Sequence, residues 1–171
     1  AVLIKDCDLS KTVIAIQGQG CIGMSVVNCH IHDIKHLDDF SQGYGMLFNL
    51  ACSNVTIISN RFKNIGRHAV YVSSGTSNVI ISENVVDGCE SSAIGAYSKS
   101  TQRVTENIEI SGNEIRNVRG HVSPRGISIA VWCKNITVRM NKLNNIQQYG
   151  IAVEGGALEE VEHNPSNIVI E

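Results

Sequence analysis

The chain has 171 residues, of which 43% are hydrophobic and 18% charged, and its net charge is −2. This length and apolar content predict one domain with a continuous core. A nearly balanced charge without a basic stripe argues against a nucleic-acid partner, and no apolar run is long enough to cross a membrane.

A repeated unit organises the sequence, and its clearest copy is NVTIISNRFKN at residues 54–64. The same pattern returns at steps of about 20 to 30 residues, a period that indicates a solenoid. The copies lie, in chain order, at residues 1–11, 24–34, 54–64, 78–88, 107–117 and 135–145, with a partial copy at 167–171.

Each copy predicts short strands. Two apolar residues stand two positions apart, as Val55 and Ile57 do, which is the pattern of a strand with one inward face. A third inward position, Phe62 in this copy, marks a second strand, and the apolar run at 69–72 marks a third. Three strands per turn without helical periodicity predict an all-β fold, a right-handed, single-stranded parallel β-helix of six to seven rungs.

An asparagine recurs at the seventh position of the unit. Because stacked rungs lie about 4.8 Å apart, each carboxamide can donate to and accept from its copy on the next rung. Asparagine also tolerates the left-handed backbone that a sharp turn between two strands needs. Ordinary turn residues would show the same preference, so the column argues for the fold and not for an activity. The predicted Asn ladder consists of Asn60, Asn84, Asn113 and Asn141.

Both ends of the chain fall inside a repeat, and neither offers an amphipathic cap for an open strand edge. We therefore expect residues 1–171 to form one β-helix domain that is a fragment of a longer protein. Its six cysteines do not predict disulfides. Cys52 and Cys133, for example, share a repeat position but lie three rungs apart, about 14 Å. Free thiols suggest folding in a reducing compartment.

No motif predicts a cofactor or a metal ion. The nearest approach to a metal motif is the stretch CHIH at 29–32, which we interpret as a structural turn. Asp87 falls between Lys63 and Arg116 in a column across the rungs, and we expect an exposed charge ladder there.

Loop lengths predict a binding trough. The turn after the second strand is short at 66–68 and 90–92 but long at 35–42 and 119–125. Two long loops thus flank two short ones on the same edge of the coil, where solenoids carry function. The predicted floor consists of Arg67, His68, Glu90 and Ser92, and the walls add Asp38, Asp39 and His121.

One outward column of side chains follows this trough, and Tyr71 lies beyond its second residue, His68. Aromatic faces cover the C–H sides of sugars, while charged and hydroxyl groups meet their oxygens. The alternative is that this column is plain solvated surface, as in any β-helix. A rival cleft between the long turns at 97–106 and 154–166 carries Trp132. The column comprises Tyr44, His68, Ser92, Arg125 and Tyr149.

With these repeats and this ladder, the chain resembles the pectate-lyase-like right-handed β-helix superfamily, which includes polysaccharide lyases, glycoside hydrolases, alginate epimerases and bacteriophage tailspikes. The resemblance covers essentially all residues. The sequence lacks the Asp-Pro-His-Asp type motif of the epimerases. Apart from Asp38 and Asp39 it also lacks paired aspartates in the arrangement of the polygalacturonases, so catalytic residues are not carried over. Free cysteines and irregular loops are most similar to tailspike-type domains. That likeness implies a homotrimer, in a virion tail or outside the cell, that binds and often cleaves a bacterial surface polysaccharide.

Two reactions fit the trough. Glycoside hydrolysis would use Glu90 with Asp38 or Asp39, because carboxylates on adjacent rungs lie about 5 Å apart and on alternate rungs about 9–10 Å apart, near the retaining and inverting distances. A lyase would use His68 or Tyr71 as the base and Arg67 or Arg125 to neutralise a uronate carboxylate. The remaining substrate-binding candidates are Tyr44 and His121.

The non-enzymatic alternative is a structural stalk or a carbohydrate-binding adhesin. In that case no acid–base pair would converge in the trough. In either case we expect His68 and Glu90 on the surface, so that their replacement leaves the melting temperature nearly intact.

Overall fold

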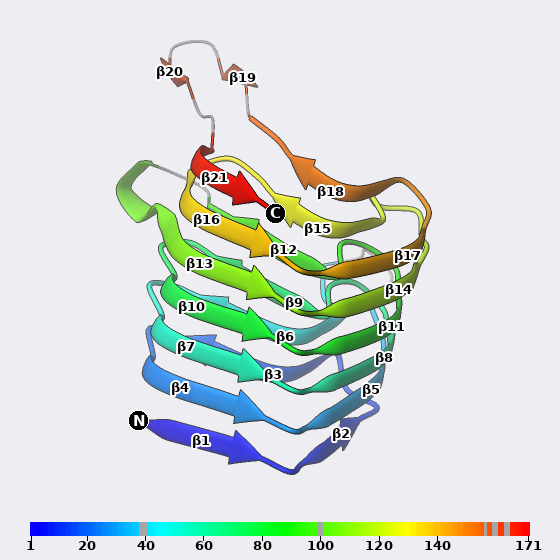
Figure 1. The fold of residues 1–171 in the computed structure, drawn as a ribbon. Helices are drawn as coiled ribbons and strands as arrows, with labels where there is room; N and C mark the ends of the chain where they lie inside the picture. Colours follow the sequence, from blue (N-terminus) through cyan, green and yellow to red (C-terminus); the bar gives the residue numbers. More distant parts are fainter. Residues whose placement is uncertain (38–40, 99–100, 156, 159–160, 163–164) are drawn as a thin grey trace.

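The computed structural model describes residues 1–37, 41–98, 101–155, 157–158, 161–162 and 165–171. Three parallel sheets run along a coil, with the N-terminal strand at one end and the C-terminal strand at the other (Figure 1). The first sheet, sheet A, contains β1 (Val2–Lys5), β4 (Ile22–Val27), β7 (Ser53–Ile58), β10 (Ser77–Ser82), β13 (Thr105–Ser111), β16 (Cys133–Arg139) and β21 (Ser166–Ile170).

The other two sheets follow the same order along the coil. Sheet B contains β2 (Asp8–Ser10), β5 (His30–Ile34), β8 (Arg61–Ile65), β11 (Val85–Cys89), β14 (Glu114–Val118) and β17 (Lys142–Ile146). Sheet C contains β3 (Ile14–Gln19), β6 (Tyr44–Asn49), β9 (Val70–Ser73), β12 (Ile94–Tyr97), β15 (Arg125–Ile129) and β18 (Tyr149–Val153).

The remaining described elements are short. A 3₁₀ helix, η1 (Thr101–Arg103), precedes β13, and the strands β19 (Ala157–Leu158) and β20 (Val161–Glu162) form an antiparallel pair. Within the described residues no helix is long and apolar enough to cross a membrane.

Each strand pairs in parallel with the strand one turn later, which confirms the predicted three-strand parallel solenoid. The coil makes about five turns, slightly fewer than the six to seven rungs expected. The regular coiling continues through β17 and β18, after which the chain leaves the stack through β19 and β20 before β21 rejoins sheet A (Figure 1).

The predicted inward columns form the core. Val55 and Ile57 of β7 pair in register with Val79 and Ile81 of β10, and all four are buried. The second-strand position is buried as well, with Phe62 at 1% exposure. Because each rung stacks its apolar side chains on those of the next, the core is one continuous cluster along the coil axis.

The predicted Asn ladder is confirmed. Asn60 Nδ2 donates to Asn84 Oδ1 at 3.0 Å, Asn84 Nδ2 to Asn113 Oδ1 at 3.0 Å, and Asn113 Nδ2 to Asn141 Oδ1 at 2.9 Å. Each of these Nδ2 atoms also donates to a main-chain carbonyl of the preceding rung, as Asn84 Nδ2 does to Ile57 O. The ladder therefore satisfies main-chain groups inside the turn as well as its own amides.

The expected left-handed backbone lies one residue earlier than predicted. It is Ser59, Glu83 and Met140, not the ladder asparagines that follow them, that have φ near 55°. A second, exposed row of asparagines does adopt this conformation, at the first position of each repeat. Its side chains are linked from rung to rung, Asn78 Nδ2 donating to Asn54 Oδ1 at 3.3 Å for example. This row consists of Asn54, Asn78, Asn107, Asn135 and Asn167.

The cysteines divide by exposure. Cys29, Cys52, Cys89 and Cys133 are buried, and burial raises the pKa of the Cys89 and Cys133 thiols to about 12. Cys7 and Cys21 are partly exposed, and Cys21 Sγ donates to Cys52 Sγ at 3.0 Å.

Thiol titration should follow this division. Since the thiolate is the reactive form, native protein should react with a thiol reagent at no more than the two partly exposed cysteines. Protein unfolded in denaturant should react at all six. Four thiols in denaturant without reductant, with the missing pair mapped to Cys21 and Cys52, would contradict the prediction that every thiol is free.

Candidate functional site

The predicted outward column runs along the edge of sheet C where its strands begin: three of its members are the first residues of β6, β15 and β18, and His68 and Ser92 lie two residues before β9 and β12. The register of β6, β9, β12, β15 and β18 aligns its five members, and Arg125 pairs directly with Tyr149. Tyr71 lies in a parallel column, between Leu47 and Gly95. The sequence period therefore predicted correctly which residues share a line across the rungs.

Three rings of this surface pack on each other. The centroids of the Tyr44 and His68 rings lie 5.6 Å apart, and those of His68 and Tyr71 lie 4.7 Å apart, both pairs stacked. Tyr44 is 7% and His68 8% exposed. The expectation that His68 lies on the surface is therefore wrong: the rings of Tyr44 and Tyr71, whose own centroids lie 5.7 Å apart, cluster with it at this outward position.

Burial fixes the protonation of His68. Its Nδ1 lies 2.8 Å from the main-chain oxygen of Ser92. A carbonyl oxygen can only accept, so Nδ1 carries the proton and Nε2 the lone pair. Burial lowers the pKa of His68 to about 4, and the nearby charges of Arg67 and Arg125 act in the same direction. At neutral pH the ring is uncharged.

Tyr71 depends on a glycine for its position. A Cβ added at Gly95 would lie 2.8 Å from Tyr71 Cδ2, so any larger residue would push the ring away from the sheet. Burial raises the pKa of the Tyr71 phenol, which therefore stays protonated at neutral pH and can donate a proton or a hydrogen bond.

Two arginines flank these rings. The guanidinium of Arg67 lies over the Tyr44 ring, 5.1 Å from its centroid, and that of Arg125 donates to Glu154 Oε2 at 2.5 Å. The Nε atoms of both arginines are buried and have no hydrogen-bond partner among the described residues. With His68 and Tyr71 they line a cavity of about 230 Å³ over sheet C, which we call the sheet C cavity. Its other polar lining residues include Ser91, Ser92, Tyr97, Ser123 and Glu154.

Glu90 lines a different cavity from His68, so the residues predicted for the floor of one trough divide between two cavities. The cavity of Glu90, about 540 Å³, follows the corner where sheet B turns towards sheet C and is lined by Asp33, Lys35, Glu90 and Arg119, among others. Glu90 Oε2 lies 3.5 Å from His36 Nε2. The turn at 90–92 divides the two spaces, because Ser91 lines one cavity and Glu90 the other.

The loop walls contribute less than expected. His121 is exposed, and it is Val122 and Ser123 of the same loop that line the sheet C cavity. Asp38 and Asp39 lie outside the described residues, so the predicted hydrolase pair has one described member, Glu90. Part of the rival cleft near Trp132 lies outside them as well.

Two acid–base partners were missed in the sequence. Glu154 binds Arg125, and His36 approaches Glu90. Glu154 and His36 both lie beside long turns whose lengths differ between repeats. The alignment of the repeats therefore did not predict their neighbours. Glu154 directly follows β18, at the start of a long turn next to the column that contains Arg125. This position was the one sequence feature that could have indicated the pairing of Glu154 with Arg125.

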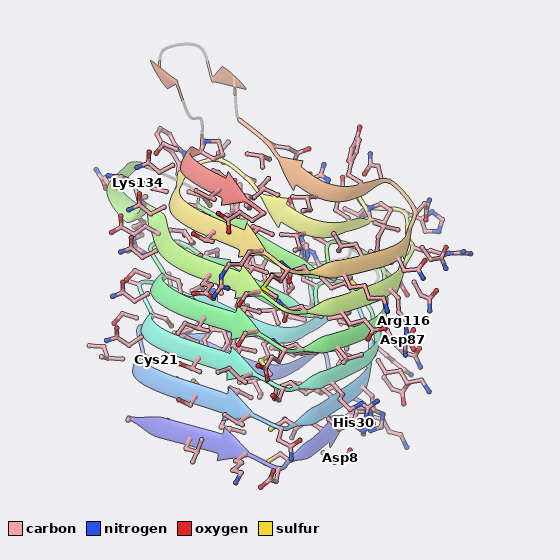
Figure 2. All side chains as sticks on the ribbon, in the orientation of Figure 1. Asp8, Cys21, His30, Asp87, Arg116 and Lys134 are labelled. Atoms are coloured by element: carbon pink, nitrogen blue, oxygen red, sulfur yellow. The ribbon has the colours of Figure 1, made fainter. Side chains whose placement is uncertain are left out.

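The outward face of sheet B carries a row of charges and imidazoles. The predicted ladder at Asp87 is confirmed, with Arg116 Nη2 donating to Asp87 Oδ2 at 3.0 Å (Figure 2). The interpretation of 29–32 as a turn is wrong, because His30 and His32 lie on β5 and project from one face of that strand. The side chain of Asp33 binds His32 and raises the pKa of its imidazole.

Comparison with known proteins agrees with this architecture. A family described as the right handed beta helix region matches residues 1–115. No curated protein matches the chain. The matched segment covers more than half of the chain and includes the rungs that carry Tyr44, His68 and Tyr71, and from it the chain belongs to the right-handed β-helix family.

Proposed function

We propose that this protein binds an acidic polysaccharide, one whose sugars carry carboxylates, in the sheet C cavity and cleaves it by β-elimination. One observation carries the proposal: the side chains of two arginines flank a stacked Tyr–His pair in a single cavity. A carboxylate is the acceptor that suits a guanidinium best, so this cavity favours an anionic ligand.

The charge balance of the cavity supports an anionic ligand. Glu154 already occupies one guanidinium, that of Arg125. Arg67 has no carboxylate partner among the described residues and contacts the face of Tyr44. A uronate carboxylate between the two arginines would accept a hydrogen bond from Arg67. It would also be a second carboxylate beside Arg125, in addition to Glu154. Tyr71 offers a ring face to the sugar that carries this carboxylate.

Elimination suits these residues better than hydrolysis does. Hydrolysis needs two carboxyl groups on either side of one glycosidic bond, whereas the carboxylate of the sheet C cavity, Glu154, is held by Arg125, and Glu90 lies in the other cavity. A lyase needs a neutralised carboxylate, a base for the proton at C5 and a proton donor for the leaving oxygen. The arginines, His68 and Tyr71 are of these types.

The proposed step follows from their protonation. Neutral His68 accepts the C5 proton on Nε2 while Arg67 stabilises the negative charge that spreads onto the carboxylate. The C4–O bond breaks, a C4–C5 double bond forms, and the Tyr71 hydroxyl protonates the departing oxygen. Because burial lowers the pKa of His68 to about 4, this base is weak, and the carboxylate charge of the ligand is what would strengthen it.

The test is a screen of uronate-containing bacterial capsule and O-antigen polysaccharides, read by binding, by the ultraviolet absorbance of unsaturated uronates and by a reducing-end assay. Arg67→Met should weaken binding about 10- to 100-fold, the range expected for a lost charge-assisted hydrogen bond. Tyr71→Phe should keep the binding and slow the appearance of ultraviolet absorbance. Arg61→Met, which removes an exposed arginine of β8 in sheet B, should change neither.

The outcomes separate the alternatives. New reducing ends without ultraviolet absorbance mean a hydrolase and remove the eliminative step. Binding that depends on Arg67, without any cleavage, means a carbohydrate-binding adhesin. Equal effects of Arg67→Met and Arg61→Met, or no binding of any acidic polysaccharide, would refute the proposed site. The trimer and the tailspike location remain part of this proposal, and a molecular mass by light scattering tests the first.

A further inference from the structure

We propose a second site, independent of the polysaccharide site: Asp8, His30 and His32 bind a divalent zinc ion on the outer face of sheet B. Figure 2 shows Asp8 and His30 on the neighbouring strands β2 and β5, where the coil begins. The three side chains each offer one ligand atom, and these atoms all lie within 4.8 Å of one another.

The strand geometry brings these residues together. Residues two apart on a strand project from the same face, so His30 and His32 both point outward from β5, and their rings stack with centroids 4.4 Å apart. Asp8 pairs in register with His30 on the adjacent strand. Its carboxylate meets both rings, Oδ2 lying 3.2 Å from His30 Nδ1 and Oδ1 lying 3.0 Å from His32 Nε2.

These separations are close to those of a formed site. In a tetrahedral zinc site with bonds of about 2.0–2.1 Å, neighbouring ligand atoms lie about 3.3 Å apart. The observed distances of 3.0 and 3.2 Å between the two carboxylate oxygens and the two rings are near this value, and the ligand atoms of all three residues lie within 4.8 Å of one another. Asp8 is exposed and the two histidines are partly exposed, so rotation of the side chains can bring these atoms together without movement of the strands.

A fourth residue orients one of the ligands. Asp33 Oδ2 lies 2.8 Å from His32 Nδ1, and Asp33 is itself held by Asn64, whose Nδ2 donates to Asp33 Oδ1 at 2.9 Å. A carboxylate that accepts from Nδ1 keeps the proton on that atom, so a metal ion would bind Nε2 and displace the proton that Nε2 donates to Asp8. Asp33 is thus a positioning residue, and it is the observation beyond the three ligands that points to a metal.

The ligand set selects the class of ion. Two imidazoles and one carboxylate suit zinc and its neighbours in the transition series, whereas magnesium and calcium require oxygen ligands throughout. The two carboxylates of Asp8 and Asp33 balance the charge of a divalent ion. Arg61 and Lys63, which pair with His30 and His32 on the next rung, oppose it, so we expect moderate affinity. Three protein ligands leave the fourth position to water or to a donor atom of another molecule.

The test uses untagged, metal-stripped protein titrated with zinc chloride and with cobalt chloride. We expect one ion per chain, and visible cobalt absorbance of a nitrogen and oxygen site without the intense near-ultraviolet band of thiolate ligands. His32→Gln should weaken binding at least 100-fold, and Asp33→Asn about 10-fold through loss of orientation. His121→Gln, in an exposed loop far along the chain, should bind as the parent does.

Two further measurements keep the proposal open to refutation. The melting temperature of His32→Gln in a chelator should equal that of the parent in the same chelator, which shows that the variant folds. Zinc should shift the imidazole nitrogen signals of His30 and His32 in the spectrum of the parent and leave those of the other histidines in place. Absent or non-saturating binding, a thiolate band, or equal affinity in His32→Gln would each overturn the site.

Discussion

Replacing Asn84 with Ala is expected to lower the free energy of unfolding by about 3 kcal/mol, because one carboxamide satisfies four groups in a buried turn. Its oxygen accepts from Asn60 N and Asn60 Nδ2, at 2.9 and 3.0 Å. Its Nδ2 donates to Ile57 O and Asn113 Oδ1, at 2.9 and 3.0 Å. The side chain is fully buried, so water does not replace these partners.

The matched control is Asn78→Gly in the exposed asparagine row. Asn78 also links two rungs, since its Nδ2 donates to Asn54 Oδ1 and its Oδ1 accepts from Asn107 Nδ2. Water can take over both hydrogen bonds, and glycine accepts the positive φ of 54° at this position. We expect a loss below about 1 kcal/mol. Chemical denaturation of both variants measures the difference, and equal midpoints would show that burial gives the inner ladder no special role.

The repeat predicted the fold and also which residues align with one another from rung to rung. Once the copies are aligned, a step of one rung carries Asn60 to Asn84 and Val55 to Val79, and the observed register follows the alignment. The same alignment contained the outer asparagine row, because Asn54 and Asn78 open their copies. That row was missed since an exposed asparagine at a turn has an ordinary local explanation, and only the repetition distinguishes it.

The line of outward residues across sheet C was predictable, but the burial of its side chains was not. The repeat period correctly placed His68 between Tyr44 and Ser92 across the rungs. The solvent exposure of an outward side chain depends on how the neighbouring side chains pack against it. The repeat period does not predict this packing. The rings of Tyr44 and Tyr71 pack against each other and against His68, which is buried, and the turn at 90–92 separates Glu90 from it.

Burial of His68 gives the second large effect, a loss of stability on acidification. In the native protein its pKa is about 4, whereas in the unfolded chain it is near the ordinary value of about 6.5. Between these two values the unfolded chain binds a proton that the native protein does not, so stability falls as the pH falls from about 6.5 to about 4 and this contribution changes no further below that. The pKa difference corresponds to about 3 kcal/mol.

His68→Asn isolates this contribution. The asparagine amide can still donate to Ser92 O but does not titrate, so the variant should be less stable than the parent at pH 7 and lose about 3 kcal/mol less between pH 6.5 and 4. Other groups, including His32, titrate equally in both proteins and cancel in the comparison. His121→Asn, an exposed histidine, should retain the pH dependence of the parent. If denaturant unfolding at several pH values gives His68→Asn the same slope as the parent, His68 is solvated and the neutral base assigned to the sheet C cavity is wrong.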